Sequence, residues 1–235
     1  MRRLAFISLG VAALLIAGGP ASADAQTDQG RELFEVHCAT CHGEDGNGSD
    51  VAPTLVGVGA AMADFQLRTG RMPMAGVRIQ AVRKPSPFDD DQMRALVAFV
   101  ASLGEGPAIP SVDAAAGDVS RGGSIFRTNC AGCHGAAGRG EALSYGRNAP
   151  DLYLATPLVI AEAVRTGPSQ MPVFDQLTDQ DVNDVAAFVM SLQEDPDPGG
   201  FGLGRLGPVP EGLVAWLVGL GLLVGIARLI ERKAS

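Results

Sequence analysis

Histidine and basic residues are scarce in this chain of 235 residues, and each shortage narrows what the protein can do. The only histidines are His37, His42 and His134, so any histidine-based catalytic or metal site must draw on these three. Lys and Arg total 18 against 26 Asp and Glu, which gives a net charge of -8. This charge repels a nucleic-acid backbone, and we expect no nucleic-acid partner. Apolar residues make up 46% of the chain, too large a share for an intrinsically disordered protein.

The N-terminus has the pattern of an export signal. Two arginines follow the initial Met, residues 4–17 are apolar, and Ala21-Ser22-Ala23 has the small residues that signal peptidase accepts. We therefore predict a secretion signal over residues 1–23. An apolar stretch this short does not reach across the hydrocarbon core of a membrane, so the alternative of an uncleaved anchor is less favoured.

The C-terminus has a longer apolar segment. Residues 213–227 carry no charge, and Arg228 can direct its charged end to water while the apolar run continues. We predict a transmembrane helix over residues 211–231, approached by a Gly/Pro-rich segment at 196–210. Basic residues at the end of the span place the C-terminus in the cytoplasm. The rest of the exported chain then lies on the outer side of a cell membrane that it crosses once.

The middle of the chain contains one sequence unit twice. Residues 30–43 match residues 122–135 at a constant offset of 92, and later segments return in the same order. The repeat predicts two domains, at residues 27–106 and 118–195, with a linker at residues 107–117. Each unit ends in apolar residues at helical spacing, and neither contains an alternating strand pattern, so we predict an all-α fold. Domains this small commonly need a cofactor to be stable.

Each unit carries the sequence Cys-x-x-Cys-His. Two thiols on one helical turn can form thioethers with the two vinyl groups of a haem, and the next residue, His, can reach the iron. We predict two covalently attached haem c groups, with attachment residues Cys38, Cys41, Cys130 and Cys133 and iron ligands His42 and His134. The alternatives are a disulfide scaffold, a four-cysteine zinc site and a thioredoxin-like pair. None of them needs a His after each second Cys.

The second axial ligand of each iron has to come from another residue type. His37 adjoins Cys38 on the attachment segment and cannot reach the opposite face of the haem. Met72 and Met171 occupy matching positions in the two units, each directly before a Pro, where the chain is held extended. We predict that these two methionines bind the irons. Met74 is the alternative in the first unit.

A further pair of matching residues can orient the ligand histidines. A histidine bound to a metal normally donates its other ring N–H to a carbonyl or carboxylate group, which fixes the ring. The carbonyl groups of Pro53 and Pro150, which follow the two Cys-x-x-Cys-His sequences, are candidates for this contact. The alternative is that these prolines only end a turn.

At these residues the repeat resembles class I c-type cytochrome domains. More narrowly, the chain resembles the dihaem cytochrome c subunit of the actinobacterial quinol–cytochrome c reductase. The features that carry this resemblance are Thr69-Gly70-Arg71-Met72-Pro73, Thr166-Gly167-Pro168 before Met171-Pro172, and a Gly/Pro-rich segment at 200–212 before one terminal helix. The resemblance implies two tandem class I cytochrome c domains, each with a C-terminal helix that crosses the N-terminal one, plus one transmembrane helix.

The resemblance also implies a function in respiration. The subunit takes electrons from a Rieske iron–sulfur protein after quinol oxidation at cytochrome b, and passes them to a haem–copper terminal oxidase. It has no catalytic site of its own. One alternative is an electron-accepting dihaem subunit of another membrane dehydrogenase or reductase, which the haem motifs alone do not distinguish. A dihaem peroxidase or sulfur-compound oxidase would need an open iron position, which Met72 and Met171 argue against.

Overall fold

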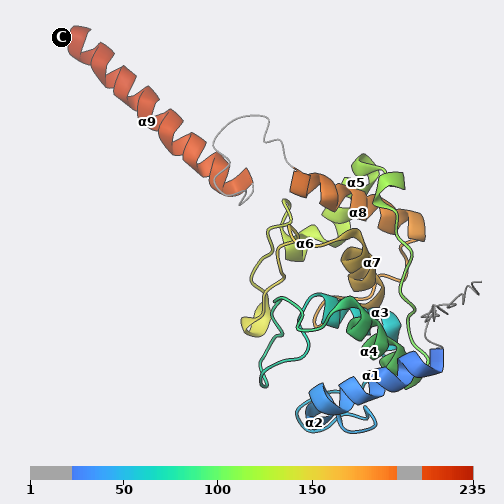
Figure 1. Ribbon diagram of the computed structural model, residues 1–235. Helices are drawn as coiled ribbons and strands as arrows, with labels where there is room; N and C mark the ends of the chain where they lie inside the picture. Colours follow the sequence, from blue (N-terminus) through green and yellow to red (C-terminus); the bar gives the residue numbers. More distant parts are fainter. Residues whose placement is uncertain (1–22, 195–207, 235) are drawn as a thin grey trace, which may run out of the picture.

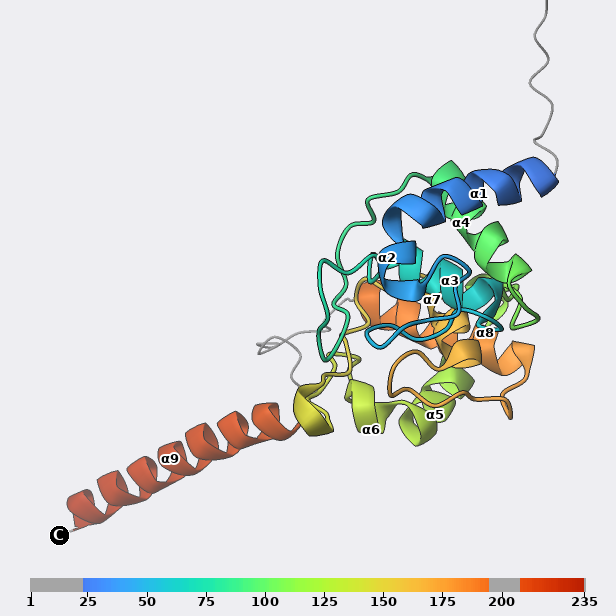
Figure 2. The same cartoon turned by 90° about the horizontal axis from the view of Figure 1, so that it is seen from below.

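The computed structural model describes residues 23–194 and 208–234. Within these ranges the chain forms helices joined by loops and turns, with one isolated bridge between Ala142 and Asn148 in place of any strand. The all-α prediction is confirmed for this part of the chain. Figures 1 and 2 show two sets of helices side by side, with the long helix α9 (Pro208–Ala234) apart from them.

The first domain is held together by two long helices that cross. Its helices are α1 (Ala23–His37), α2 (Ala39–His42), α3 (Gly59–Arg68) and α4 (Asp90–Ser102). Phe34 of α1 and Phe99 of α4 are both fully buried, and their ring centroids lie 4.9 Å apart. The crossing depends on Gly30, because a Cβ atom at this position would lie 2.0 Å from the carbonyl oxygen of Ala95. The repeated glycine thus lets the two helix backbones meet.

The second domain repeats this crossing. Its elements are a 3-10 turn η1 (Ala114–Ala116), α5 (Val119–Asn129), α6 (Ala131–His134), a turn η2 (Ser144–Gly146), α7 (Pro157–Thr166) and α8 (Asp179–Glu194). Phe126 of α5 packs on Phe188 of α8, with ring centroids 5.2 Å apart. A Cβ atom at Gly122 would lie 1.9 Å from the carbonyl oxygen of Asp184. The crossing of first and last helices that the resemblance implies is therefore present in both domains.

The closing helix of each domain begins with an acidic side chain that accepts a hydrogen bond from a backbone N–H group. Asp89 precedes α4, and its carboxylate accepts a hydrogen bond of 2.9 Å from the backbone N–H of Gln92. Thr178 precedes α8, and its backbone N–H donates to the carboxylate of Asp181 at 2.9 Å. Both contacts satisfy backbone N–H groups that have no partner within the helix, and the acidic groups are stabilised by the helix dipole.

The predicted linker is anchored to both domains. The carbonyl oxygen of Pro107 accepts a 3.0 Å hydrogen bond from the backbone N–H of Ala61 in α3. Farther along the linker, the backbone N–H of Asp113 donates to the side-chain oxygen of Asn183 in α8 at 2.9 Å. The repeat indicated a connection here but gave no sign of these contacts.

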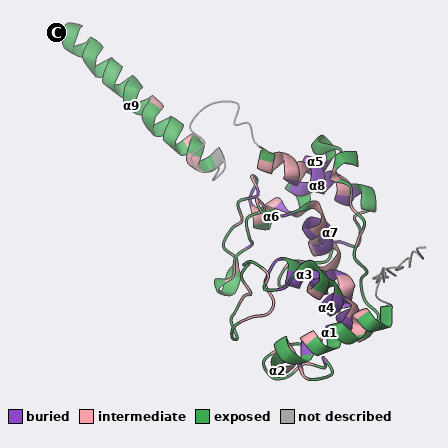
Figure 3. Ribbon diagram, in the orientation of Figure 1, coloured by how far each residue is buried: buried purple, intermediate pink, exposed green. Residues whose placement is uncertain are grey.

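The two domains pack against each other through α3 and α7. Phe65 of α3 is only 4% exposed, and it belongs to the apolar core of the second domain, which includes Val159 and Ile160 of α7. Figure 3 shows buried residues on both of these helices. Away from α3 and α7, the side chain of Gln80 donates to the carbonyl oxygen of Asn148 at 2.7 Å and accepts from its backbone N–H at 2.9 Å. The domains therefore share part of their core.

An acidic pair lies buried in this contact. Glu162 of α7 is fully buried, and Asp64 of α3 is 3% exposed. Asp64 accepts two hydrogen bonds from Arg68, of 2.7 and 2.8 Å. Burial, followed by the nearby Asp64, raises the pKa of Glu162 to about 9, against a smaller lowering by Arg68. Glu162 is therefore protonated and neutral at neutral pH.

The buried proton on Glu162 predicts a stability that depends on pH. The unfolded chain releases this proton near pH 4.5 and the folded chain only near pH 9, so stability should fall as the pH rises between these values. Glu162→Gln keeps a neutral side chain at every pH and should remove this fall, which is at most about 1.4 kcal/mol per pH unit. Urea unfolding at several pH values measures the slope. Glu35→Gln, on an exposed position of α1, is the control, and an unchanged slope in Glu162→Gln would contradict the assignment.

Helix α9 has the properties of a membrane anchor. Within Val209–Lys233, the most apolar window of 18 residues has a mean hydropathy of 2.3, and none of this window is buried in the protein (Figure 3). A helix of 25 residues is about 37 Å long at ~1.5 Å per residue, enough to cross a hydrocarbon core of roughly 30 Å. The predicted span at 211–231 lies inside α9. The predicted signal, except for Ala23 at the start of α1, and the approach segment up to residue 207 lie outside the described residues.

Candidate haem sites

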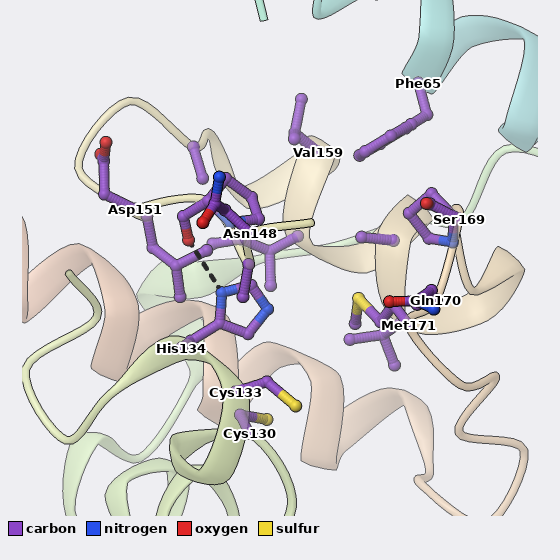
Figure 4. Close-up of a pocket in the computed structure, with 18 of the residues that line it drawn as sticks. Phe65, Cys130, Cys133, His134, Asn148, Asp151, Val159, Ser169, Gln170 and Met171 are labelled. Atoms are coloured by element: carbon purple, nitrogen blue, oxygen red, sulfur yellow. Dashed lines mark hydrogen bonds between the residues drawn. The ribbon is translucent and has the colours of Figure 1, made fainter. Parts of the chain in front are cut away.

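The second domain contains a pocket that brings its four candidate residues together. Cys130, Cys133, His134 and Met171 all line this pocket. Cys130 directly precedes α6, Cys133 and His134 are the last two residues of α6, and Met171 comes from the loop after α7. Figure 4 shows the sulfur of Met171 across the pocket from the ring of His134, with the two cysteine sulfurs below the ring. Residues distant in sequence thus converge on one space.

The ring of each candidate histidine is held by a proline carbonyl group. The distance from Nδ1 to the carbonyl oxygen is 2.9 Å both for His134 and Pro150, where Figure 4 marks it, and for His42 and Pro53. A carbonyl oxygen can only accept, so Nδ1 carries the hydrogen and Nε2 keeps its lone pair. Burial lowers the pKa of His134, which keeps the ring neutral. The predicted contacts are confirmed, and they leave Nε2 as the nitrogen able to bind a metal.

Glycines allow the proline segment to approach each histidine. Gly48 has φ 87° and Gly140 has φ 75°, a backbone conformation that strongly favours glycine. Their backbone N–H groups donate to the carbonyl oxygens of His42 and His134, at 2.7 and 2.8 Å. A Cβ atom at Gly48 would lie 2.6 Å from the backbone nitrogen of Thr54, so a larger residue would push the proline segment away.

The first cysteine of each motif, Cys38 or Cys130, is a neutral thiol. Burial, together with the neighbouring Cys41 or Cys133, raises the pKa of Cys38 and of Cys130 to about 11. The two pairs also lie in different domains, and the described residues include no group of three His, Cys, Asp or Glu side chains able to hold a metal ion. These features argue against a four-cysteine zinc site.

The first domain has the same attachment segment, while its methionine ligand stays a prediction. His42 is 8% exposed at the end of α2, and Cys38 and Cys41 lie on the same turn. Met72 follows α3, where its backbone N–H donates to the carbonyl oxygen of Gln66 at 3.1 Å. Met72 and Met74 are both half-buried, so burial does not choose between them.

The pocket of the second domain fits a haem. Two thiols, a neutral imidazole and a thioether are the groups that attach the porphyrin edge and bind the iron from both sides. The wall is otherwise largely apolar, as the faces of a porphyrin require, and includes Val159, Ile160, Val164 and Phe174.

Part of the pocket wall was not predicted from the sequence. Phe65, Arg71, Gln80 and Arg83 line the pocket of the second domain although they belong to the first. The repeat assigns each residue to its own unit, so no signal within the repeat could place them. Arg71 has no counterpart at the matching position of the second unit, where Gln170 precedes Met171. This asymmetry is the one sequence feature that sets Arg71 apart.

Comparisons with known proteins agree with this architecture. The family model described as "Cytochrome c" matches residues 27–104, and the model described as "Cytochrome C oxidase, cbb3-type, subunit III" matches residues 117–189. Both domains therefore carry the features of haem c-binding domains.

Similar whole proteins carry consistent names. The cytochrome bc1 complex cytochrome c subunit of Corynebacterium efficiens is 41% identical, over 88% of this chain and 76% of that protein. The cytochrome bc1 complex cytochrome c subunit of Mycobacterium tuberculosis is 39% identical, over 99% of this chain and 92% of that protein. A cbb3-type cytochrome c oxidase subunit FixP of Sinorhizobium medicae is 29% identical, over 69% of this chain and 59% of that protein. The first two similarities extend over both domains.

Proposed function

Because this chain belongs to the family of cytochrome bc1 complex cytochrome c subunits, we propose that it binds two haem c groups and conducts electrons through them within that respiratory complex. The observation that carries the haem proposal is the convergence of Cys130, Cys133, His134 and Met171 on one pocket. The first domain repeats the attachment segment and the contact between histidine and proline, which supports a second haem.

In this proposal each domain attaches and orients its own haem. The thiols of Cys38 and Cys41, and of Cys130 and Cys133, form the thioether bonds. His42 and His134 would bind iron through Nε2, and Met72 and Met171 would supply thioether sulfurs as the second protein ligands. When bound, the haem iron supplies exchange of single electrons.

The protein side chains favour electron transfer over catalysis. A histidine and a methionine on each iron would leave no position for a substrate, and a thioether ligand would stabilise reduced iron and so raise the reduction potential. The apolar wall excludes water from the haem faces, which supports the same effect. The subunit thus belongs to an oxidoreductase complex while its own domains carry electrons.

The proposed partners are those of a quinol-oxidising complex. Electrons enter from the Rieske iron–sulfur subunit beside cytochrome b, and leave to a haem–copper terminal oxidase. The similarity to a subunit of a cbb3-type oxidase supports the second part. Helix α9 holds the chain in the cell membrane, with the haem domains outside and the C-terminus, after Arg232 and Lys233, in the cytoplasm. Fixed attachment gives a high effective concentration between carriers.

Purification of the full chain from its native membrane tests this proposal. We expect cytochrome b and a Rieske protein to purify with the chain. Addition of quinol should then reduce all of the haem c in the chain. Removal of the Rieske protein should stop that reduction. Purification with a different dehydrogenase, and without cytochrome b, would instead support the alternative in which this chain accepts electrons from another membrane enzyme.

A further inference from the structure

The pocket of the second domain is closed on one side by the first domain. Phe65 of α3 points into this pocket from the side away from Cys130 and Cys133 (Figure 4). The guanidinium group of Arg71 lies 4.9 Å from the centroid of the Phe65 ring, and Arg71 lines the same pocket. Arg71 is thus placed on the side that the first domain contributes.

The positions of the haem substituents determine which groups face the first domain. The two vinyl groups lie on one edge of the porphyrin, and the two propionates, both anionic, lie on the opposite edge. If Cys130 and Cys133 hold the vinyl edge, the propionates point away from these cysteines. A partly buried carboxylate needs cations or hydrogen-bond donors, and arginine binds carboxylates with two parallel hydrogen bonds.

Three arginines line the pocket and lack a described carboxylate partner. Arg71, Arg83 and Arg147 all line it, and within residues 23–194 no ion pair involves any of them. The Nε atom of Arg147 is buried without a hydrogen-bond partner in the described part of the chain.

The contact between the domains holds two of these arginines in place. Gln80 and Asn148 exchange the two hydrogen bonds described above, and they are close neighbours in sequence of Arg83 and Arg147, respectively. These hydrogen bonds tie the segment of the first domain that carries Arg83 to the loop of the second domain that carries Arg147. An anionic group between the two segments would be bound from both domains at once.

We propose that Arg71 and Arg83 of the first domain, together with Arg147 of the second, bind the propionates of the second haem, so that the first domain completes the second haem site. The proposal rests on the proposed function, because it requires a haem in this pocket. Arg71 directly precedes Met72, the predicted iron ligand of the first haem. In this arrangement, Arg71 binds a propionate of the second haem and is the sequence neighbour of a ligand of the first haem.

Redox titration of the full-length protein tests this assignment. A nearby positive charge stabilises the reduced haem, so Arg147→Gln should lower the potential of one of the two reduction steps. The step that shifts identifies the haem of the second domain. Arg83→Gln, in the first domain, should lower the potential of the same step. The equilibrium constant of reduction should fall by roughly threefold to tenfold. Arg83→Lys keeps the charge and should restore most of the wild-type potential.

The control is Arg78→Gln, which removes the same charge from an exposed position of the same segment that does not line the pocket. In this variant, the reduction potentials of both haems should stay unchanged. Two attached haems with unchanged potentials in Arg83→Gln, or a shift of the step that Arg147→Gln does not move, would overturn the shared site and leave the proposed function intact. A protein without haem absorbance would overturn the proposed function itself.

Discussion

Met171→Ala is expected to leave the second haem attached but to open one coordination position on its iron. A thioether ligand stabilises reduced iron, so its loss should lower the reduction potential of that haem, by an amount on the order of 0.1 V within the span of ~0.8 V that axial ligands cover. The open position should also bind carbon monoxide in the reduced protein. Titration with carbon monoxide should therefore find one binding haem per chain in the variant and none in the wild type.

The control for this experiment is Met190→Leu. Met190 is a half-buried residue of α8 that packs against the core of the same domain but does not line the pocket. Its replacement by Leu should change neither the potential nor carbon monoxide binding. An unchanged spectrum and potential in Met171→Ala would show that another residue binds the iron.

The same experiment decides between the two methionines of the first domain. Met72→Ala should open the iron of the first haem, and Met74→Ala should not. If Met74→Ala opens the iron and Met72→Ala does not, the argument from matching repeat positions is wrong for this domain.

Removal of the chain from Leu213 onward is expected to abolish most electron flow from quinol to oxidase while both haem spectra stay normal. The apolar stretch of α9 contributes nothing to either domain core, because none of it is buried against them. The haem domains should therefore stay folded. Electron flow should fall by about 100-fold or more at micromolar protein, because the tether no longer supplies its high effective concentration. Oxygen uptake by membranes that lack the full-length chain measures this loss.

A second variant separates attachment from specific contacts of α9. Replacement of residues 213–231 by an unrelated apolar helix should restore electron flow if α9 acts as a tether alone. Full activity of the soluble fragment at micromolar concentration would instead indicate a diffusing carrier, and the fixed position of the subunit in a complex would be wrong.

The features that were predictable from the sequence are those that short or repeated sequence patterns determine. Apolar spacing indicated α4 and α8, and the repeat located the attachment residues and the proline carbonyl groups that orient His42 and His134. These features depend on residues that are close along the chain or that occur twice. Gly30 and Gly122 were recognised as repeated positions, and the structure adds their reason, which is the close contact between crossing helices.

The contact between domains was not predictable in this way. Phe65 lies in α3 of the first unit but packs in the core of the second, and a periodic pattern does not say which domain an apolar face will cover. Glu162 is an acidic residue in an apolar helix, and from sequence alone such a residue indicates a solvated position, whereas the structure buries it beside Asp64. Arg71 was noticed only as part of Thr-Gly-Arg-Met-Pro. These residues depend on the complementary shape of two units, which neither unit specifies alone.

Mass spectrometry of haem-bearing peptides tests the central claim most directly. The denatured full-length chain, isolated from its own membranes and digested, should yield two peptides that each carry one covalent haem. One contains residues 38–42 and the other residues 130–134. This result does not depend on whether residues 1–23 have been removed. Haem on only one of these peptides, or on neither, would contradict the account of this protein as a dihaem electron carrier.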